Sequence, residues 1–167
     1  CDDRNLHFHV VRDPKDDFAR QVFDVLRAGD PVTIFGPWGD FVLRADSPRP
    51  ILFVASEAGF APTKGLVEHA LSLDRAELLH LYWHAARPAG HYLVNLCRAW
   101  ADALDNFRYT TMAGGGAEDI VARMARDHGD LAAFDIYLAG PEAFADGAAK
   151  ALAQQGFPAA QLSVTAT

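Results

Sequence analysis

The sequence has few cysteines, no cluster of basic side chains and no long hydrophobic stretch. Its two cysteines, Cys1 and Cys97, are too few for a disulfide framework, an iron–sulfur site or a structural zinc site. A formal charge of −7 without a lysine- or arginine-rich run argues against nucleic acid as a partner. The apolar runs, such as Ile51 to Ala55, are far too short to span a bilayer. We therefore expect a cytoplasmic protein with no membrane span and no metal centre.

The composition is that of a folded protein, with 50% hydrophobic and 22% charged residues. The first 46 residues read differently from the rest. Their apolar periodicity predicts three short strands at Leu6–Val10, Pro31–Phe35 and Phe41–Leu43, with a helix over Phe18–Leu26 between the first two. Three strands and one helix make a poor core on their own. We therefore interpret residues 1–46 as part of a larger β domain.

From residue 51 onward, strands and helices alternate. The predicted strands are Ile51–Ala55, Glu77–Trp83, Phe107–Met112, Phe134–Ala139 and Leu162–Thr165. Amphipathic helices are predicted between them. Regular alternation of this kind predicts a parallel sheet with right-handed crossovers. The fold class is thus α/β, with residues 51–167 forming a doubly wound domain, residues 47–50 a linker and residues 1–46 a partial β module.

Two loops of the α/β domain are suited to bind a phosphate. One is Ser56–Pro62, after the first strand, and the other is Gly140–Glu142, after the fourth. In open α/β sheets, ligands bind beyond the carboxyl ends of the strands, where helix N-termini favour an anion. The full G-x-G-x-x-G fingerprint is absent, so glycines that only turn the chain from strand to helix are an equally good interpretation.

Five segments occur in an order that resembles the ferredoxin–NADP reductase superfamily. They are Gly36–Phe41, Ile51–Ala55, Gly59–Lys64, Leu81–Pro88 and Asp135–Pro141. The fourth is similar to the family's Tyr-x-Gly-x-Arg segment and the fifth to its Tyr-x-Cys-Gly-Pro segment. The resemblance is strongest to the NAD(P)H-dependent flavin reductase components that serve oxygenases and deoxysugar dehydratases.

This resemblance implies an FAD-binding antiparallel β-barrel followed by an NAD(P)-binding domain with five strands in the order 3-2-1-4-5. A hydride would pass from NAD(P)H to FAD, and electrons would then leave singly to an acceptor such as an oxygenase or an iron–sulfur protein. Residues 1–46 would be the C-terminal part of the barrel, and its N-terminal half would precede Cys1. With half of the flavin domain missing, we expect this chain alone to hold FAD weakly or not at all.

The resemblance also implies roles for individual residues. The loop residues Gly59, Phe60, Ala61 and Pro62 would cradle the pyrophosphate of the nucleotide. Arg87 would lie near the adenosine ribose, although a solvated loop arginine is an equally good interpretation. Gly140 and Pro141 would border the nicotinamide pocket, and His9 and Val10 would lie on the barrel strand beside the flavin. With no basic cluster after the second strand, we expect NADH rather than NADPH.

Several residues depart from the family pattern at the cofactor positions. Glu57 and Ala58 stand where the family has glycine and threonine, Asp16 and Asp17 replace a pyrophosphate-binding Gly-x-x-Ser segment, and Ala139 replaces a cysteine. A carboxylate at position 57 would repel a phosphate. Two hypotheses therefore remain: an NAD(P)H-dependent flavoprotein reductase, or a catalytically degenerate module of the same fold that acts in protein interaction or regulation.

Overall fold

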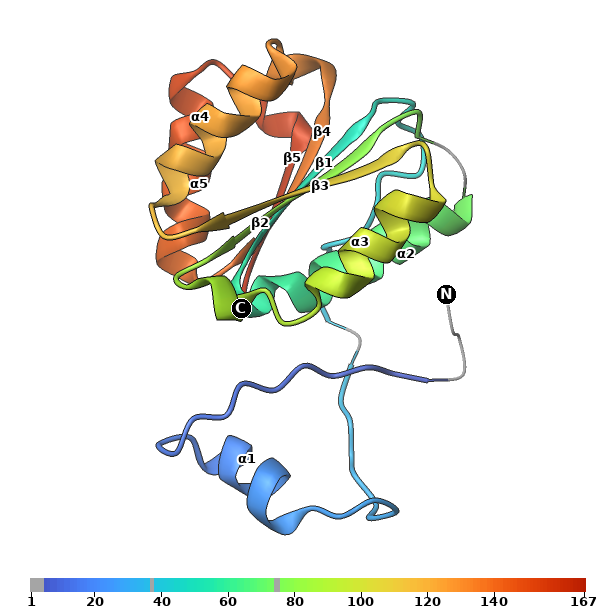
Figure 1. Ribbon diagram of the computed structural model, residues 1–167, viewed down its shortest axis with the longest axis vertical. Helices are drawn as coiled ribbons and strands as arrows, with labels where there is room; N and C mark the ends of the chain where they lie inside the picture. Colours follow the sequence, from blue (N-terminus) through green and yellow to red (C-terminus); the bar gives the residue numbers. More distant parts are fainter. Residues whose placement is uncertain (1–4, 37, 74–75) are drawn as a thin grey trace. The chain divides into compact units, whose positions relative to one another are not determined.

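The computed structural model of the protein describes residues 5–36, 38–73 and 76–167. Residue contacts divide the chain after Asp40 into two compact units (Figure 1). The larger unit, residues 41–167, contains the sheet, and the smaller one contains a single short helix. No helix within the described residues combines the length and the apolar character that crossing a membrane requires.

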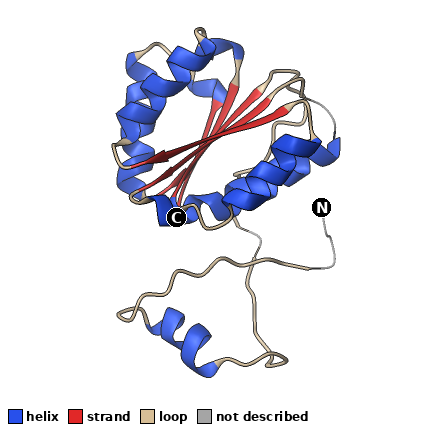
Figure 2. Ribbon diagram, viewed as in Figure 1, coloured by secondary structure: helices blue, strands red, loops and turns tan. Residues whose placement is uncertain are grey.

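The larger unit is built on a five-stranded parallel sheet (Figure 2). Its strands are β1 Ile51–Ser56, β2 Leu79–Ala85, β3 Phe107–Ala113, β4 Asp135–Gly140 and β5 Leu162–Ala166. The spatial order is β3-β2-β1-β4-β5, and every neighbouring pair is parallel. The predicted fold class and the predicted order 3-2-1-4-5 are therefore confirmed for this unit.

Helices cover both faces of the sheet. They are α2 Phe60–Leu73, α3 Val94–Ala103, α4 Ala117–His128 and α5 Glu142–Gln154. Helices α2 and α3 lie on one face, and α4 and α5 lie on the other (Figure 1). Successive strand residues enter opposite cores: Phe53 packs in the cluster with α2 and α3, whereas Leu52 packs in the cluster with α4 and α5. This two-sided burial explains why β1 is apolar from Ile51 to Ala55.

The smaller unit contains the helix α1 Asp17–Arg20, which continues as the π-helical turn η1 Gln21–Val25. The carboxylate of Asp16 caps it by accepting a hydrogen bond from the backbone N–H of Phe18 at 2.8 Å. This confirms a helix within the predicted range.

The three strands predicted near the chain start do not form in the structure. Leu6–Val10 and Pro31–Phe35 in the smaller unit, and Phe41–Leu43 at the start of the larger one, have no strand assignment. An alternating pattern expresses only a preference for a half-buried surface, whereas a strand also requires a hydrogen-bonded neighbour. The partial barrel and the boundaries at residues 46 and 50 stay predictions.

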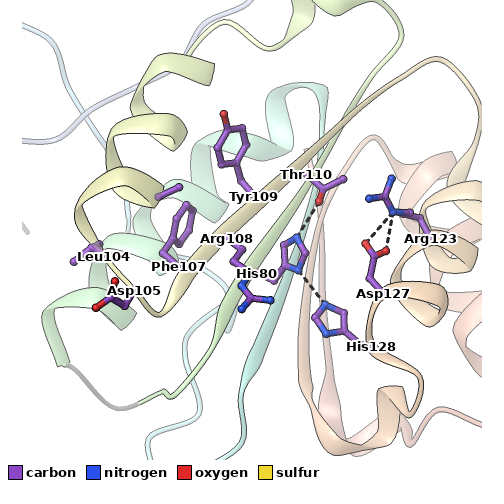
Figure 3. Close-up of a pocket in the computed structure, with 11 residues that line it drawn as sticks. His80, Leu104, Asp105, Phe107, Arg108, Tyr109, Thr110, Arg123, Asp127 and His128 are labelled. Atoms are coloured by element: carbon purple, nitrogen blue, oxygen red, sulfur yellow. Dashed lines mark hydrogen bonds and ion pairs between the residues drawn. The ribbon is translucent and has the colours of Figure 1, made fainter.

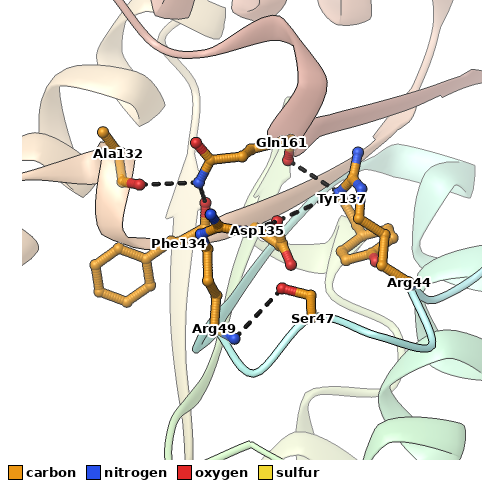
Figure 4. A network of polar contacts seen from close by, with 8 residues as sticks. All are labelled: Arg44, Ser47, Arg49, Ala132, Phe134, Asp135, Tyr137 and Gln161. Atoms are coloured by element: carbon orange, nitrogen blue, oxygen red, sulfur yellow. Dashed lines mark hydrogen bonds and ion pairs between the residues drawn. The ribbon is translucent and has the colours of Figure 1, made fainter.

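A polar network connects the segment before β1 with β4 and with the residue that precedes β5 (Figure 4). The backbone N–H of Arg44 donates to the Tyr137 hydroxyl at 2.7 Å, and its guanidinium donates to the carbonyl of Gln161 at 3.1 Å. The same guanidinium lies 3.5 Å from the carboxylate of Asp135, whose side chain is only 2% exposed. Arg49 approaches this carboxylate at 3.9 Å. The Oδ1 atom of Asp135 has no hydrogen bond among the described residues, so these two cations compensate its charge.

We expect Arg44→Met to lower the free energy of unfolding by about 2–4 kcal/mol, because it leaves a buried carboxylate without its nearer cation. Arg49→Met is the matched control. Its side chain is 47% exposed and its ion pair is longer, so the expected loss is below about 1 kcal/mol. Urea denaturation of the two variants measures the difference. Equal losses would show that Arg44 does not compensate the charge of Asp135.

Candidate functional site

The two predicted ligand loops meet at the carboxyl edge of the sheet. Strand β1 lies between β2 and β4, so the strand order reverses there. A Cβ atom at Gly59 would overlap the carbonyl oxygen of Ala139, and one at Gly140 would lie 2.8 Å from the Cβ of Ser56. Both positions therefore require glycine for close packing. The two loops therefore contact each other at the switch point.

The loop after β1 is short, and contacts of Phe60 and Thr63 stabilise its conformation. It forms one 3₁₀ turn, Glu57–Gly59, and passes directly into α2 at Phe60. The ring of Phe60 is buried and stacks on Trp83 with centroids 3.8 Å apart. The hydroxyl of Thr63 donates to the carbonyl of Gly59 at 2.7 Å. The predicted residues Ala61 and Pro62 thus lie in the first turn of α2.

Glu57 has an unusual backbone and a specific partner. Its φ of 49° lies in the left-handed region, which side-chain-bearing residues seldom adopt. Its carboxylate accepts a hydrogen bond from the backbone N–H of Ala86 at 2.5 Å, so it bridges the loops that follow β1 and β2. The carboxylate therefore occupies one backbone donor at the carboxyl edge of the sheet.

The remaining predicted site residues lie in three places. Gly140 ends β4 and Pro141 is the N-cap of α5. Arg87 is exposed and precedes the 3₁₀ turn Pro88–Gly90. His9 and Val10 are half-buried residues of the smaller unit. Their proposed proximity to a flavin stays a prediction.

One pair at this edge was not among the predicted site residues. Ser56 is the last residue of β1 and His84 the next-to-last residue of β2. The two are paired in register, and Ser56 Oγ lies 3.0 Å from His84 Nδ1. Both side chains are buried. The imidazole ring also stacks on Phe144 of α5, with centroids 4.9 Å apart. In the sequence, His80, Tyr82 and His84 alternate with apolar residues, a pattern that indicates one strand face but does not identify their partners.

A separate polar cavity lies near the amino half of β2 and β3 (Figure 3). Its volume is about 700 Å³, and its polar lining includes His80, Thr110, Arg123, Asp127 and His128. His80 Nδ1 lies 3.0 Å from His128 Nε2, and His80 Nε2 lies 2.9 Å from the Thr110 hydroxyl. The Nε atom of Arg123 donates to both carboxylate oxygens of Asp127. None of the predicted ligand-loop residues lines this cavity.

The pKa of His80 is lowered from 6.5 to about 4, and burial is the largest cause. The neighbouring His128, Arg108 and Arg123 contribute to the lowering, whereas the carboxylate of Asp127 acts in the opposite direction. Burial also lowers the pKa of His128. The histidine pair is therefore neutral at physiological pH.

We expect the protein to lose stability as the pH falls from 6.5 to about 4. His80 becomes protonated near pH 6.5 in the unfolded chain but only near pH 4 in the folded chain. Between these values protonation favours the unfolded chain, so the folded chain keeps its full stability only above pH 6.5. The loss is at most about 1.4 kcal/mol per pH unit. Urea denaturation across this range should show a smaller slope for His80→Asn than for the exposed control His69→Asn. Equal slopes in both variants would contradict the assignment.

The chain has relatives among known proteins. The family model described as the oxidoreductase NAD-binding domain matches residues 53–150. A CDP-6-deoxy-L-threo-D-glycero-4-hexulose-3-dehydrase reductase from Yersinia pestis is 31% identical over 144 residues, which cover 81% of this chain and 43% of the relative. The reductase component of propane 2-monooxygenase from Rhodococcus jostii is 24% identical over 173 residues, which cover 95% of this chain and 46% of the relative.

Among solved structures, the ferredoxin reductase in carbazole 1,9a-dioxygenase matches with a TM-score of 0.77 at 18% identity. The match covers 95% of this chain and 49% of the other, and it shows a shared fold. The chain thus spans less than half the length of these relatives. Because the family model matches more than half of its residues, the chain belongs to the oxidoreductase NAD-binding domain family.

Proposed function

We propose that this chain is part of an NAD(P)H-dependent flavoprotein reductase that delivers electrons to a partner protein. The observation that carries the proposal is the backbone contact of the Gly59 and Gly140 loops at the switch point of the sheet. In an NAD-binding domain, this is where a dinucleotide approaches the backbone most closely. The names of the Yersinia and Rhodococcus relatives, both reductases, support the same activity.

The residues at the carboxyl edge fit a dinucleotide in most respects. Gly59 leaves its loop without a side chain, and the N-termini of α2 and α5 both face this edge. We assign the pyrophosphate to Gly59–Pro62, the nicotinamide to Gly140 and Pro141, and the adenosine ribose to Arg87. When bound, NAD(P)H supplies the hydride and FAD accepts it and releases single electrons. The chain's own task is to hold and orient the nucleotide.

The start of α1 does not fit a flavin pyrophosphate. The carboxylate of Asp16 already caps the helix, and Asp17 pairs with Arg20. Flavin binding therefore depends on other surfaces, among which we include His9 and Val10. The smaller unit also exposes large apolar side chains, with Phe8 64%, Phe35 82% and Trp38 86% exposed. We propose that the N-terminal half of the flavin domain covers them, because such a concentration is rare on a free surface.

The electron acceptor belongs to the same proposal. We propose an oxygenase as the acceptor, because the Rhodococcus relative is the reductase component of propane 2-monooxygenase. An iron–sulfur protein is the second candidate. We propose NADH as the donor because no basic cluster follows β2 to hold a 2′-phosphate. The cytoplasm stays the expected location.

A second candidate function rests on Glu57. Its carboxylate occupies the N–H of Ala86 and stands close to the loop that a pyrophosphate would use. A charge of the ligand's own sign weakens binding there. This observation favours the alternative of a non-catalytic module acting in protein interaction or regulation.

Substitution of Glu57 and Ala58 separates the two functions. We expect Glu57→Gly with Ala58→Thr to raise NADH affinity, because the first change removes repulsion and the second restores a hydroxyl donor. The expected gain is about 10- to 100-fold from the charge and about fivefold from the hydroxyl. Isothermal titration calorimetry of the native and substituted chains measures it, with the remote Glu77→Gly as the matched control.

Three results would change this interpretation. Tight binding by the native chain would show that Glu57 does not oppose the ligand, and catalysis would then be the better hypothesis. The absence of any gain in the double variant would show that binding is lost for other reasons, and would favour the non-catalytic module. An equal gain in Glu77→Gly would assign the effect to net charge rather than to the loop.

A further inference from the structure

His84 carries a buried nitrogen that the fold itself does not use. Its side chain is 8% exposed, and Nε2 has no hydrogen-bond partner among the described residues. Two other buried polar atoms in that part of the chain share this property, Trp83 Nε1 and Asp135 Oδ1. Asp135 has its two arginines, and Trp83 lies in the core on the opposite face of the sheet. Of the three, His84 is the one that contacts both Ser56, at the end of β1, and Phe144 of α5.

The hydrogen bond to Ser56 determines which nitrogen of His84 carries the proton. Ser56 Oγ has His84 Nδ1 as its partner among the described residues. If the hydroxyl donates to Nδ1, its proton is used and the ring proton is on Nε2. In the opposite tautomer, both the hydroxyl proton and the Nε2 lone pair are left without partners. Since buried polar groups without partners are costly, the first arrangement is favoured. Nε2–H is therefore a buried donor that lacks an acceptor.

The surroundings of this donor favour an anionic oxygen. The ring stacks on Phe144, in the first turn of the 13-residue helix α5. The backbone N–H groups of that turn and the helix dipole attract negative charge. Ser56 also lies against Gly140, because a Cβ on Gly140 would be 2.8 Å from that of Ser56. His84 thus contacts Ser56 at the end of β1, and Ser56 in turn lies against Gly140 at the end of β4.

We propose that His84, oriented by Ser56, donates its Nε2–H to a phosphate oxygen of the nicotinamide dinucleotide. This inference rests on the proposed function and adds a binding residue to it. The half-buried ring of Phe144 stacks on the face of this imidazole. Ser56 acts as a positioning residue, because it touches the imidazole and fixes its tautomer.

Two substitutions of His84 separate the donor from the packing. His84→Asn keeps an amide near Nδ1 and the contact with Ser56 but has no group at the position of Nε2. His84→Gln places its amide nitrogen at the position of Nε2. A hydrogen bond to a charged oxygen corresponds to about 10- to 100-fold in affinity. We therefore expect His84→Asn to weaken NADH binding by that factor and His84→Gln to retain it within about threefold.

The titrations use the 167-residue chain and the Glu57→Gly, Ala58→Thr variant, in which binding is expected to be stronger. His80→Asn is the matched control, because it makes the same change on the same strand face outside the ligand loops. Long-range ¹H–¹⁵N spectra provide a second readout. We expect the protonated nitrogen of His84 to be Nε2 and its resonances to shift when NADH is added, which a purely structural role would not produce.

The outcomes distinguish a failure of this inference from a failure of the proposed function. If NADH binds and His84→Asn binds it as tightly as His80→Asn does, the role of His84 is wrong while the proposed function stands. The same conclusion follows if Nδ1 carries the proton, or if the resonances of His84 do not respond to saturating NADH. If neither the native chain nor the double variant binds NADH, the proposed function is wrong and this inference with it.

Discussion

The backbone contact between Gly59 and the end of β4 is the constraint on which the carboxyl edge depends. Any side chain at position 59 would overlap the carbonyl oxygen of Ala139, so the loop after β1 would have to move away from β4. That loop leads directly into α2, and Gly140 leads through Pro141 into α5. The separation of the two helix N-termini is thus fixed by two residues without side chains. A site for an extended anion follows from this packing, because two positive helix ends are held side by side.

The carboxyl edge of the sheet contains groups that have opposite effects on the binding of an anion. The helix N-termini and the Nε2–H of His84 favour an anion, whereas Glu57 brings a carboxylate among them. Its hydrogen bond to Ala86 satisfies that charge within the protein, and its left-handed backbone stores strain of about 1–3 kcal/mol. A ligand phosphate must therefore compete with an internal anion. For this reason, the structure of a dinucleotide-binding domain is compatible with weak binding of the dinucleotide.

The sequence predicted those features that depend on local pattern and chain order. Regular alternation was sufficient for the parallel α/β class, and the apolar run Ile51–Ala55 indicated a strand covered on both faces. The strand order came from the resemblance to the reductase family. The sequence could not predict features that depend on lateral partners. Leu6–Val10 alternates as a strand would, but no neighbouring strand pairs with it in the structure. The contact between Ser56 and His84 requires the register of β1 against β2, which residues 28 positions apart do not reveal. The direction of the Glu57 side chain depends on a backbone conformation that composition does not indicate.

The choice between a reductase and a non-catalytic module depends on features that packing does not require. The contact of Gly59 and Gly140 supports a dinucleotide site at this edge, but packing alone also requires glycine at both positions, so it does not show whether the site still binds. Glu57 is satisfied by Ala86 and can serve either function. The Nε2 atom of His84 is different, because burying a donor without an acceptor destabilises the fold by about 1–3 kcal/mol and contributes nothing to packing. Unmet polar groups of this kind are uncommon in native interiors and call for a specific explanation. A ligand that supplies the acceptor offsets this cost, so the buried imidazole favours a site that still binds.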